Sequence, residues 1–275
     1  MTGGSIPSRL GVEPADPPTP VDHLEHLERL DRLDALRGFA VIWMAAFHAC
    51  FDLNHLGLWQ PQQNFYHDPF WTVQRTLIVS LFMVCAGMGQ AVAHQQVVGW
   101  GRFWRRWAQV AACAVCVSVG SAWMFPRSWI SFGVLHGMAV MWIVLRLTSR
   151  WRLPWVWLGA ALILAPQVIQ HPWFDSRWTW WVGLVTHKPV TEDYVPVLPW
   201  LGVMGWGWAL GQWLLQQAPG SRFDALRGQI SPVWRPLAIL GRWSLSFYMV
   251  HQPVILGLLM VGLAWGWWSA ATIAR

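Results

Sequence analysis

The chain has little charge. Asp, Glu, Lys and Arg make up only 12% of its 275 residues, while 55% are hydrophobic. A soluble domain carries roughly twice that charged fraction. The apolar residues lie in blocks of about 18 to 22, the length that crosses a hydrocarbon core of ~30 Å. The scarcity of charge therefore predicts an integral membrane protein in a lipid bilayer. We attribute the net charge of +6 to membrane-flanking loops and expect no nucleic-acid partner.

Cysteine is also scarce, and its positions argue against a disulfide or metal site. All four cysteines fall inside apolar blocks, namely Cys50, Cys85, Cys113 and Cys116. Such positions favour neither a disulfide framework nor a zinc knuckle. We interpret the CxxC spacing of Cys113 and Cys116 as small packing residues, and the sequence predicts no bound metal.

The first 30 residues lack an apolar stretch, which argues against a signal peptide. They are polar and proline-rich (VEPADPPTP), and this composition predicts a disordered cytosolic tail over residues 1–30. A short charged helix (HLEHLERLDRL) then leads into the first apolar block. We expect residues 31–275 to form a single transmembrane domain.

The apolar blocks predict an all-α, polytopic bundle of about seven transmembrane helices. They cover residues 36–56, 70–92, 104–124, 130–147, 153–170, 197–216 and 238–265. Of the 19 Lys and Arg residues, 14 fall in the tail and the even-numbered loops, and only four fall on the opposite side. Because positive charge is retained in the cytoplasm, this asymmetry predicts a cytoplasmic N-terminus. We expect a multi-pass protein of the bacterial inner (plasma) membrane.

Ionisable residues inside the predicted spans are the candidates for function, because charge is costly in a bilayer. Arg37 and His48 are 11 residues apart, close to three helical turns, so they share one face about 16 Å apart. Asp34, Asp52 and His55 lie on or near the same stripe. The first span thus joins a cation at its inner boundary to an imidazole deep in the membrane.

Two further histidines reach a similar depth. We expect His136 and His251, on the fourth and last spans, to meet His48 about a third of the way below the outer face. Arg75 lies near that level and could pair with Asp52. A neutral imidazole suits general-base catalysis or acylation, with Asp52 to orient it. An arginine at the inner mouth suits a phosphate-bearing donor.

Four motifs, in order along residues 30 to 260, resemble a known family. They are RLDALRGFAVIWMAAFH followed by FD, ISFGVLHGMA, DYVPVLPWLGV and LGRWSLSFYMVHQP. Together they resemble the heparan-alpha-glucosaminide N-acetyltransferase catalytic-domain family, within the transmembrane acyltransferase superfamily. That superfamily has an arginine, ten residues and then a histidine in its first span, a spacing that Arg37 and His48 match.

The resemblance implies an acyltransferase that moves an acyl group, often acetyl, from cytosolic acyl-CoA to a sugar or glycan on the outer side. It implies that His48 is catalytic and that Arg37 lies on the coenzyme A side, where we also place Asp34. His136, Tyr248 and His251 would line the site, with Tyr248 counted among the cofactor-binding residues.

The chain has fewer spans than the lysosomal member of that family and no large luminal domain, so the acceptor site stays undefined. We place Arg75, His55 and His67 on the substrate side. In the lysosomal member, the loop after the first span is a candidate location for the essential histidine. His55 and His67 are therefore alternates to His48.

Two other functions compete with acyl transfer. In a proton- or anion-coupled transporter, His48, Asp52, Arg75 and His251 would form the path, although paired broken helices are not evident. A bis-histidine haem protein would use His48, His136 and His251, but such sites need opposed pairs, and the sequence offers one layer only. The oligomeric state is open, with a homodimer as one alternative.

Overall fold

The computed structural model describes residues 30–149, 154–217, 226 and 230–267. The predicted disordered tail and most of the charged helix before the first block lie outside these residues. The described residues form α-helices and short 3₁₀ helices with no β-strand, which confirms the prediction of an all-α chain.

Each predicted apolar block contains a helix. The helices are α2 (Asp31–His55), α3 (Pro69–Gln95), α4 (Trp100–Met124), α5 (Val134–Leu147), α6 (Pro154–Val168), α7 (Val197–Leu215), α8 (Arg235–Arg242) and α9 (Ser244–Ala264). The last block is divided, because a break at Trp243 separates α8 from α9. Three 3₁₀ helices, η1 (Pro172–Asp175), η2 (Trp180–Val182) and η3 (Pro232–Trp234), lie in the connections.

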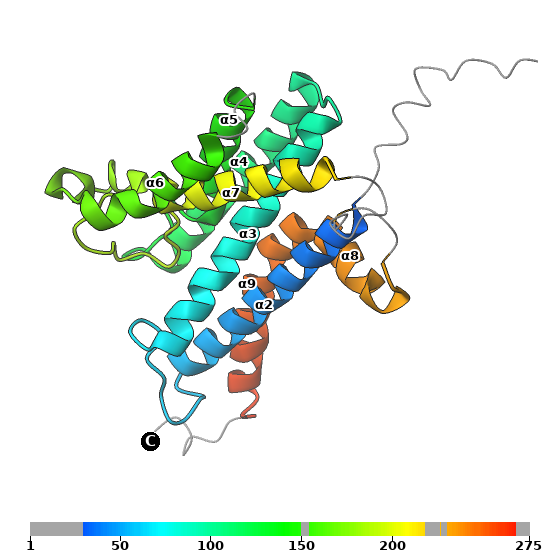
Figure 1. Cartoon of the computed structure of the whole chain (residues 1–275). Helices are drawn as coiled ribbons and strands as arrows, with labels where there is room; N and C mark the ends of the chain where they lie inside the picture. The colour runs from blue at the N-terminus through cyan, green and yellow to red at the C-terminus, as the bar shows by residue number, and fades with distance from the viewer. Residues whose placement is uncertain (1–29, 150–153, 218–225, 227–229, 268–275) are drawn as a thin grey trace, which may run out of the picture.

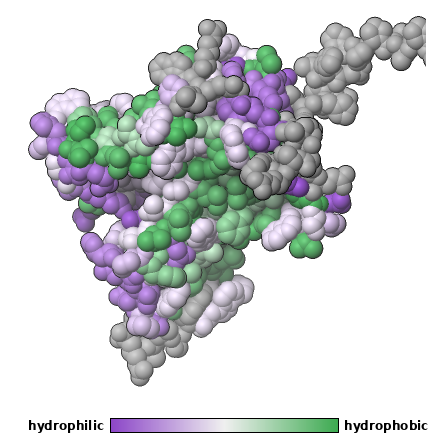
Figure 2. Space-filling view, viewed as in Figure 1, coloured by the Kyte–Doolittle hydropathy of each residue, from purple (hydrophilic) through white to green (hydrophobic). Residues whose placement is uncertain are grey.

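Four of the described helices, α2, α3, α4 and α9, are long and apolar enough to cross a membrane. The apolar helices α5 and α6 are shorter than a bilayer span. The integral membrane character is therefore supported, whereas the count of seven spans and the cytoplasmic N-terminus stay predictions. Figure 2 shows broad apolar surface over the helices, bordered by hydrophilic patches.

Small residues bring the helix axes close together. At Gly38 of α2, a Cβ atom would strike the backbone carbonyl of Leu237 in α8, and at Gly87 of α3 it would strike that of Met204 in α7. Gly202 of α7 similarly lies against the backbone of α6. Such contacts are typical of membrane helices, where association depends on close backbone packing rather than on a hydrophobic driving force.

The helices form two groups that contact each other. In the first, α2 packs against α3, α8 and α9, and α3 then carries α7, which crosses it and packs on α6 (Figure 1). In the second, α4 packs on α5. The first group brings the first and last predicted spans side by side, although about 200 residues separate them in the sequence.

The segments that follow α2, α4 and α6 meet at one end of the bundle. The Nζ atom of Lys188 lies 5.7 Å from the centre of the Tyr66 ring, which joins the third segment to the first. The backbone N–H of Val195 donates to the carbonyl of Phe132 over 3.3 Å, which joins the third segment to the second. We call this end the loop end; it is the end that the charge asymmetry predicts to lie outside the cytoplasm.

Candidate functional site

The histidines of the first and last apolar blocks lie together. The ring centres of His48 in α2 and His251 in α9 are 5.3 Å apart. His251 is 8% exposed and stacks on Phe247, whereas His48 is partly buried and meets the edge of Phe47. Two imidazoles therefore face each other in a largely aromatic environment.

The hydrogen bonding of His251 leaves one ring nitrogen available. Its Nδ1 atom lies 2.7 Å from the carbonyl oxygen of Tyr248. Because a carbonyl only accepts, Nδ1 carries the proton, and Nε2 holds a lone pair. Nε2 is buried and has no hydrogen-bond partner among the described residues. A buried polar atom without a partner is unusual in a folded protein and calls for an explanation.

Asp52 is buried, with 4% of its surface exposed, and its Oδ2 atom accepts a hydrogen bond of 2.9 Å from Nε2 of Gln252. This bond ties α2 to α9 directly beside the histidine pair. The predicted pairing of Asp52 with Arg75 is not among the ion pairs of the described residues. Sequence reasoning missed Gln252, although it directly follows His251 in the motif LGRWSLSFYMVHQP.

His136 does not join the histidine pair, because both of its ring nitrogens are engaged at the start of α5. Nδ1 accepts a hydrogen bond from the backbone N–H of Gly133 over 3.2 Å, which caps the helix. Nε2 lies 3.1 Å from the hydroxyl of Ser118, and that hydroxyl donates to the carbonyl of Ile130. The predicted meeting of three histidines is therefore seen for His48 and His251 alone.

Arg37 lies in an ion network at the N-terminal end of α2. Its Nη1 atom is 3.1 Å from Oδ1 of Asp34, and its side chain is 27% exposed. Arg242 of α8 lies 2.6 Å from Asp31 and 3.6 Å from Asp34. Two guanidinium groups thus meet two carboxylates at the end of the bundle opposite the loop end, which we call the basic end.

The predicted substrate-side residues lie toward the loop end. His55 stacks on Phe51 with ring centres 6.0 Å apart and planes at 10°. His67 is exposed in the loop between α2 and α3, where its backbone N–H donates to Asn64. Arg75 is partly buried in the first turns of α3 and has no hydrogen bond or ion pair with any described residue.

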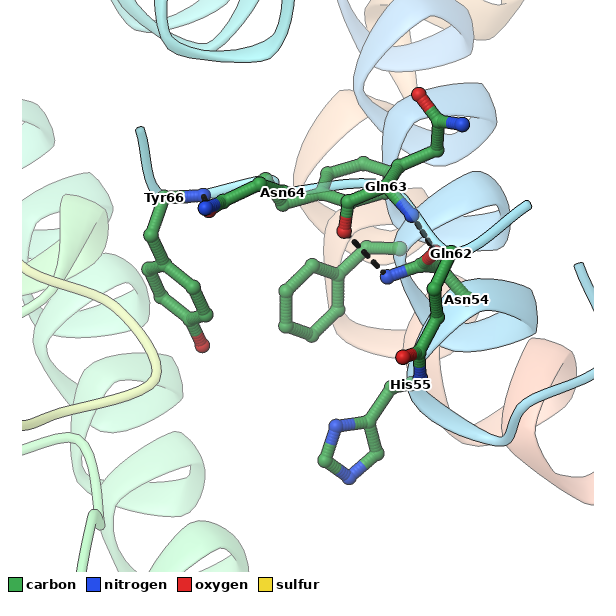
Figure 3. Close-up of a pocket in the computed structure, with 8 residues that line it drawn as sticks. Asn54, His55, Gln62, Gln63, Asn64 and Tyr66 are labelled. Carbon is green, nitrogen blue, oxygen red and sulfur yellow. Dashed lines mark hydrogen bonds between the residues drawn. The ribbon is translucent and has the colours of Figure 1, made fainter. Parts of the chain in front are cut away.

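A pocket of about 320 Å³ opens at the loop end, between the last turns of α2 and the following loop (Figure 3). It is lined by aromatic and amide side chains, namely Phe51, Asn54, His55, Gln62, Gln63, Asn64, Phe65 and Tyr66. Asn54 and the backbone of Gln63 exchange two hydrogen bonds of 3.0 and 2.6 Å, which hold the loop in place. The pocket begins within one helical turn of Asp52.

Asp193 is a second residue that sequence reasoning missed. Its Oδ2 atom accepts a 2.8 Å hydrogen bond from the backbone N–H of Val134, at the start of α5. A side chain at Gly133 would collide with this carboxylate, so the glycine makes the contact possible. Asp193 also lies beside Tyr248 of α9, one turn from His251. Asp193 lies in the motif DYVPVLPWLGV, which contributed to the family resemblance, but the motif alone indicated no role for this residue.

Burial raises the pKa of Asp193 above its ordinary value. The hydrogen bond from Val134 and the nearby charges of Lys188 and Arg75 act in the opposite sense. Asp193 therefore links the loop before α7 electrostatically to α3, and by direct contact to α5 and α9. We note that no group of three His, Cys, Asp or Glu side chains in the described part of the chain could hold a metal ion.

Taken together, these contacts define a helical membrane protein with a histidine pair between a basic end and a polar pocket. The family described as heparan-alpha-glucosaminide N-acetyltransferase, catalytic, matches residues 29–253, and the chain belongs to it. This match confirms the resemblance seen in the four sequence motifs. No curated protein and no solved structure matches the chain significantly.

Proposed function

We propose that the protein is a membrane acyltransferase that moves an acyl group, in our assignment acetyl, from cytosolic acyl-CoA to a sugar or glycan on the other side of the membrane. Membership of an acetyltransferase family supports transferase chemistry. The observation that carries the proposal is the buried, unpartnered Nε2 of His251, directly beside His48. An imidazole with an available lone pair is the group that acyl transfer requires.

In the proposed reaction, the acceptor hydroxyl or amine attacks the thioester carbonyl. A C–O or C–N bond forms, the C–S bond breaks, and the acceptor proton passes through imidazole to the leaving thiolate, which departs as the thiol of coenzyme A. We assign the proton transfers to His48 and His251. A positioned base of this kind contributes about 10²- to 10⁴-fold to the rate.

The donor side lies at the basic end. Arg37 and Arg242 present guanidinium groups that suit the phosphates of coenzyme A, and Asp31 and Asp34 hold them in place. From Arg37 the helix leads about 16 Å along its axis to His48. This geometry requires the N-terminus of the domain to face the cytoplasm, where acyl-CoA is found.

The acceptor side lies at the loop end. Amide side chains and aromatic rings line the pocket beyond Asp52, and such surfaces suit a polar, ring-shaped ligand. Tyr248 contacts both His251 and Asp193, and so joins the histidine pair to the loop before α7. In this arrangement His55 borders the acceptor, and the catalytic role falls on His48 and His251.

Thermal unfolding of the detergent-solubilised chain tests the donor assignment. We expect acetyl-CoA to raise the unfolding temperature of the wild-type protein, because a ligand that binds the native state stabilises it. Arg37→Gln should weaken this effect, whereas Arg127→Gln, at an exposed position in the loop between α4 and α5, should not. The absence of any acetyl-CoA effect on the wild-type protein would argue against the proposed donor.

A transporter remains the second candidate, because Arg75 and Asp52 provide intramembrane charge that catalysis does not directly use. A transporter should be indifferent to acetyl-CoA and should move protons or anions in sealed vesicles. Acetyl-CoA stabilisation, together with release of free thiol in the presence of a glycan mixture, would favour the acyltransferase.

A further inference from the structure

Gln252 brings a second unpartnered acceptor to the histidine pair. It directly follows His251 on α9, and its Oε1 atom is buried and accepts no hydrogen bond from any described residue. Nε2 of His251 is buried without a partner in the same way. Buried polar atoms without partners are rare in folded proteins, so two of them on consecutive residues call for a common explanation.

The hydrogen bond to Asp52 fixes the direction in which the Gln252 amide points. Oδ2 of Asp52 accepts from Nε2 of Gln252 over 2.9 Å. Because a carboxylate accepts hydrogen bonds and donates none, the amide nitrogen faces Asp52 and Oε1 points away from it. The oxygen and nitrogen of this amide are therefore distinguished by their partner. Asp52 acts as a positioning residue, which holds the amide and leaves Oε1 available.

Helix α2 places this amide between the histidine pair and the pocket. His48, Asp52 and His55 follow one another at intervals of four and three residues, so they share one face of α2. His55 lines the pocket (Figure 3). On α9, His251 faces His48, and Gln252 bonds to Asp52. A ligand that extends along this face from the pocket to the histidines therefore passes the Gln252 amide.

Both available atoms accept hydrogen bonds, so the ligand that satisfies them must donate twice. Nε2 of His251 and Oε1 of Gln252 carry lone pairs and no hydrogen. In the proposed reaction, the imidazole takes the proton of the attacking hydroxyl or amine. Oε1 then needs a second donor. The acetyl thioester has no N–H or O–H at its acetyl group or sulfur, whereas a sugar carries further hydroxyl or amine groups on its ring.

We propose that Gln252 is an acceptor-binding residue, whose Oε1 atom holds a second hydroxyl or amine of the acceptor while His251 takes the proton of the attacking group. This inference rests on the proposed function. It narrows the acceptor to a molecule with two hydrogen-bond donors at its reacting end. An alcohol or amine with a single donor would leave Oε1 unsatisfied, and a site built to hydrogen-bond a substrate group rejects molecules that lack it.

Separate saturation curves for acceptor and donor test this role. The acceptor probe is a glycan extract of cells that lack the gene, and the rate is the release of coenzyme A thiol from acetyl-CoA by the full chain in detergent. Gln252→Met removes the amide and nearly keeps the side-chain length. We expect it to raise the half-saturating extract concentration about three- to tenfold, the magnitude of one hydrogen bond. The half-saturating acetyl-CoA concentration should change by less than about twofold.

Gln74→Met is the matched control. Oε1 of Gln74 in α3 accepts a 3.1 Å hydrogen bond from Nε1 of Trp43 in α2, so this variant also removes a glutamine that ties α2 to a neighbouring helix. We expect both half-saturating concentrations to stay within about twofold of the wild-type values. A glutamine that only holds two helices together has no reason to affect the acceptor and spare the donor.

The outcomes separate this role from the proposed reaction. Unchanged acceptor saturation in Gln252→Met, or an equal rise for acetyl-CoA, would overturn the role of Gln252 and leave the proposed reaction in place. If the wild-type protein releases no thiol with the extract, the proposed function itself is contradicted, and this inference with it. If Gln252→Met does not fold, Gln252→Asn carries the test, because it keeps an amide but withdraws the oxygen by one carbon. The same selective rise is expected.

Discussion

The two ends of α2 handle polar groups in opposite ways. At the basic end, Arg37 and Arg242 both have carboxylate partners, and helix α8 is packed against α2 through Gly38. Toward the loop end, Nε2 of His251 is buried without a partner, and His48 lies beside it. Paired charges give the first region a defined geometry. Unpartnered atoms give the second region a capacity for chemistry, at a cost in stability.

His136 and His251, which the sequence predicts at similar depths, show the same contrast. Both nitrogens of His136 are hydrogen-bonded where α5 begins, whereas only one nitrogen of His251 is. Both residues are histidines, so residue type alone does not distinguish a structural histidine from a reactive one. The hydrogen-bond partners do.

The largest expected effect is on catalysis. His48→Ala and His251→Ala should each reduce acyl transfer by about 10²- to 10⁴-fold, because each removes an imidazole from the proposed proton path. His251→Ala also removes the buried ring and its hydrogen bond from Nδ1 to Tyr248, so we expect it to cost at least about 1 kcal/mol of stability, and its transfer activity is measured on the folded fraction. Release of coenzyme A thiol and thermal unfolding measure the two effects. Full transfer activity in either variant would remove that histidine from the mechanism.

The next effect tests the packing of the basic end. Gly38→Ala should destabilise the protein by about 1–3 kcal/mol. Its methyl group would collide with backbone atoms of α8, and a backbone cannot move aside as a flexible side chain can. Gly120→Ala is the matched control, since a Cβ there meets nothing within 4 Å. Thermal unfolding in detergent measures both. Equal stability of the two variants would contradict the close approach of α2 and α8.

His136→Ala sharpens the comparison of the two histidines. It should cost about 1–2 kcal/mol of stability, because the start of α5 loses its capping acceptor and Ser118 loses a partner. Acyl transfer by the folded fraction should fall by less than about threefold. A loss as large as that of His251→Ala would place His136 in the reaction after all.

Asp52→Asn should have a smaller effect. The amide oxygen can still accept the hydrogen bond from Gln252, so we expect a stability change below about 1 kcal/mol. Asp52→Leu is the informative partner variant, because it leaves the Gln252 amide without an acceptor. If Asp52→Asn abolishes transfer while the fold is intact, the charge of Asp52 takes part in the reaction, and its role is not limited to the hydrogen bond that holds Gln252 of α9.

The smallest effect on stability is expected at Arg242. Its side chain is 37% exposed, and pairs of that kind contribute only about 0.2–1 kcal/mol. Arg242→Gln should therefore unfold near the wild-type temperature in the absence of ligand. The stabilisation by acetyl-CoA should still decrease, which separates a donor-binding role from a structural one.

Much of the fold was accessible from the sequence. All seven apolar blocks contain a helix at nearly the predicted position, because helix formation in a membrane follows from local hydrophobicity and the need to satisfy backbone groups internally. The break at Trp243 and the short lengths of α5 and α6 were not accessible, because both depend on how neighbouring helices pack.

The candidate site was predictable only in part. Helical spacing placed Arg37 and His48 on one face of a single helix, a local property. Gln252 and Asp193 were missed, since nothing local distinguishes an amide or carboxylate that faces another helix from one that faces solvent.

The sequence by itself determined the class of this protein. Composition, block length and four motifs sufficed for an all-helical membrane protein of an acetyltransferase family. Only the tertiary structure decided which polar groups meet: His48 with His251, Asp52 with Gln252, and Asp193 with the backbone of Val134. Two of these contacts join residues about 200 positions apart. They depend on how the helices pack, a property that the periodicity of any one helix does not contain.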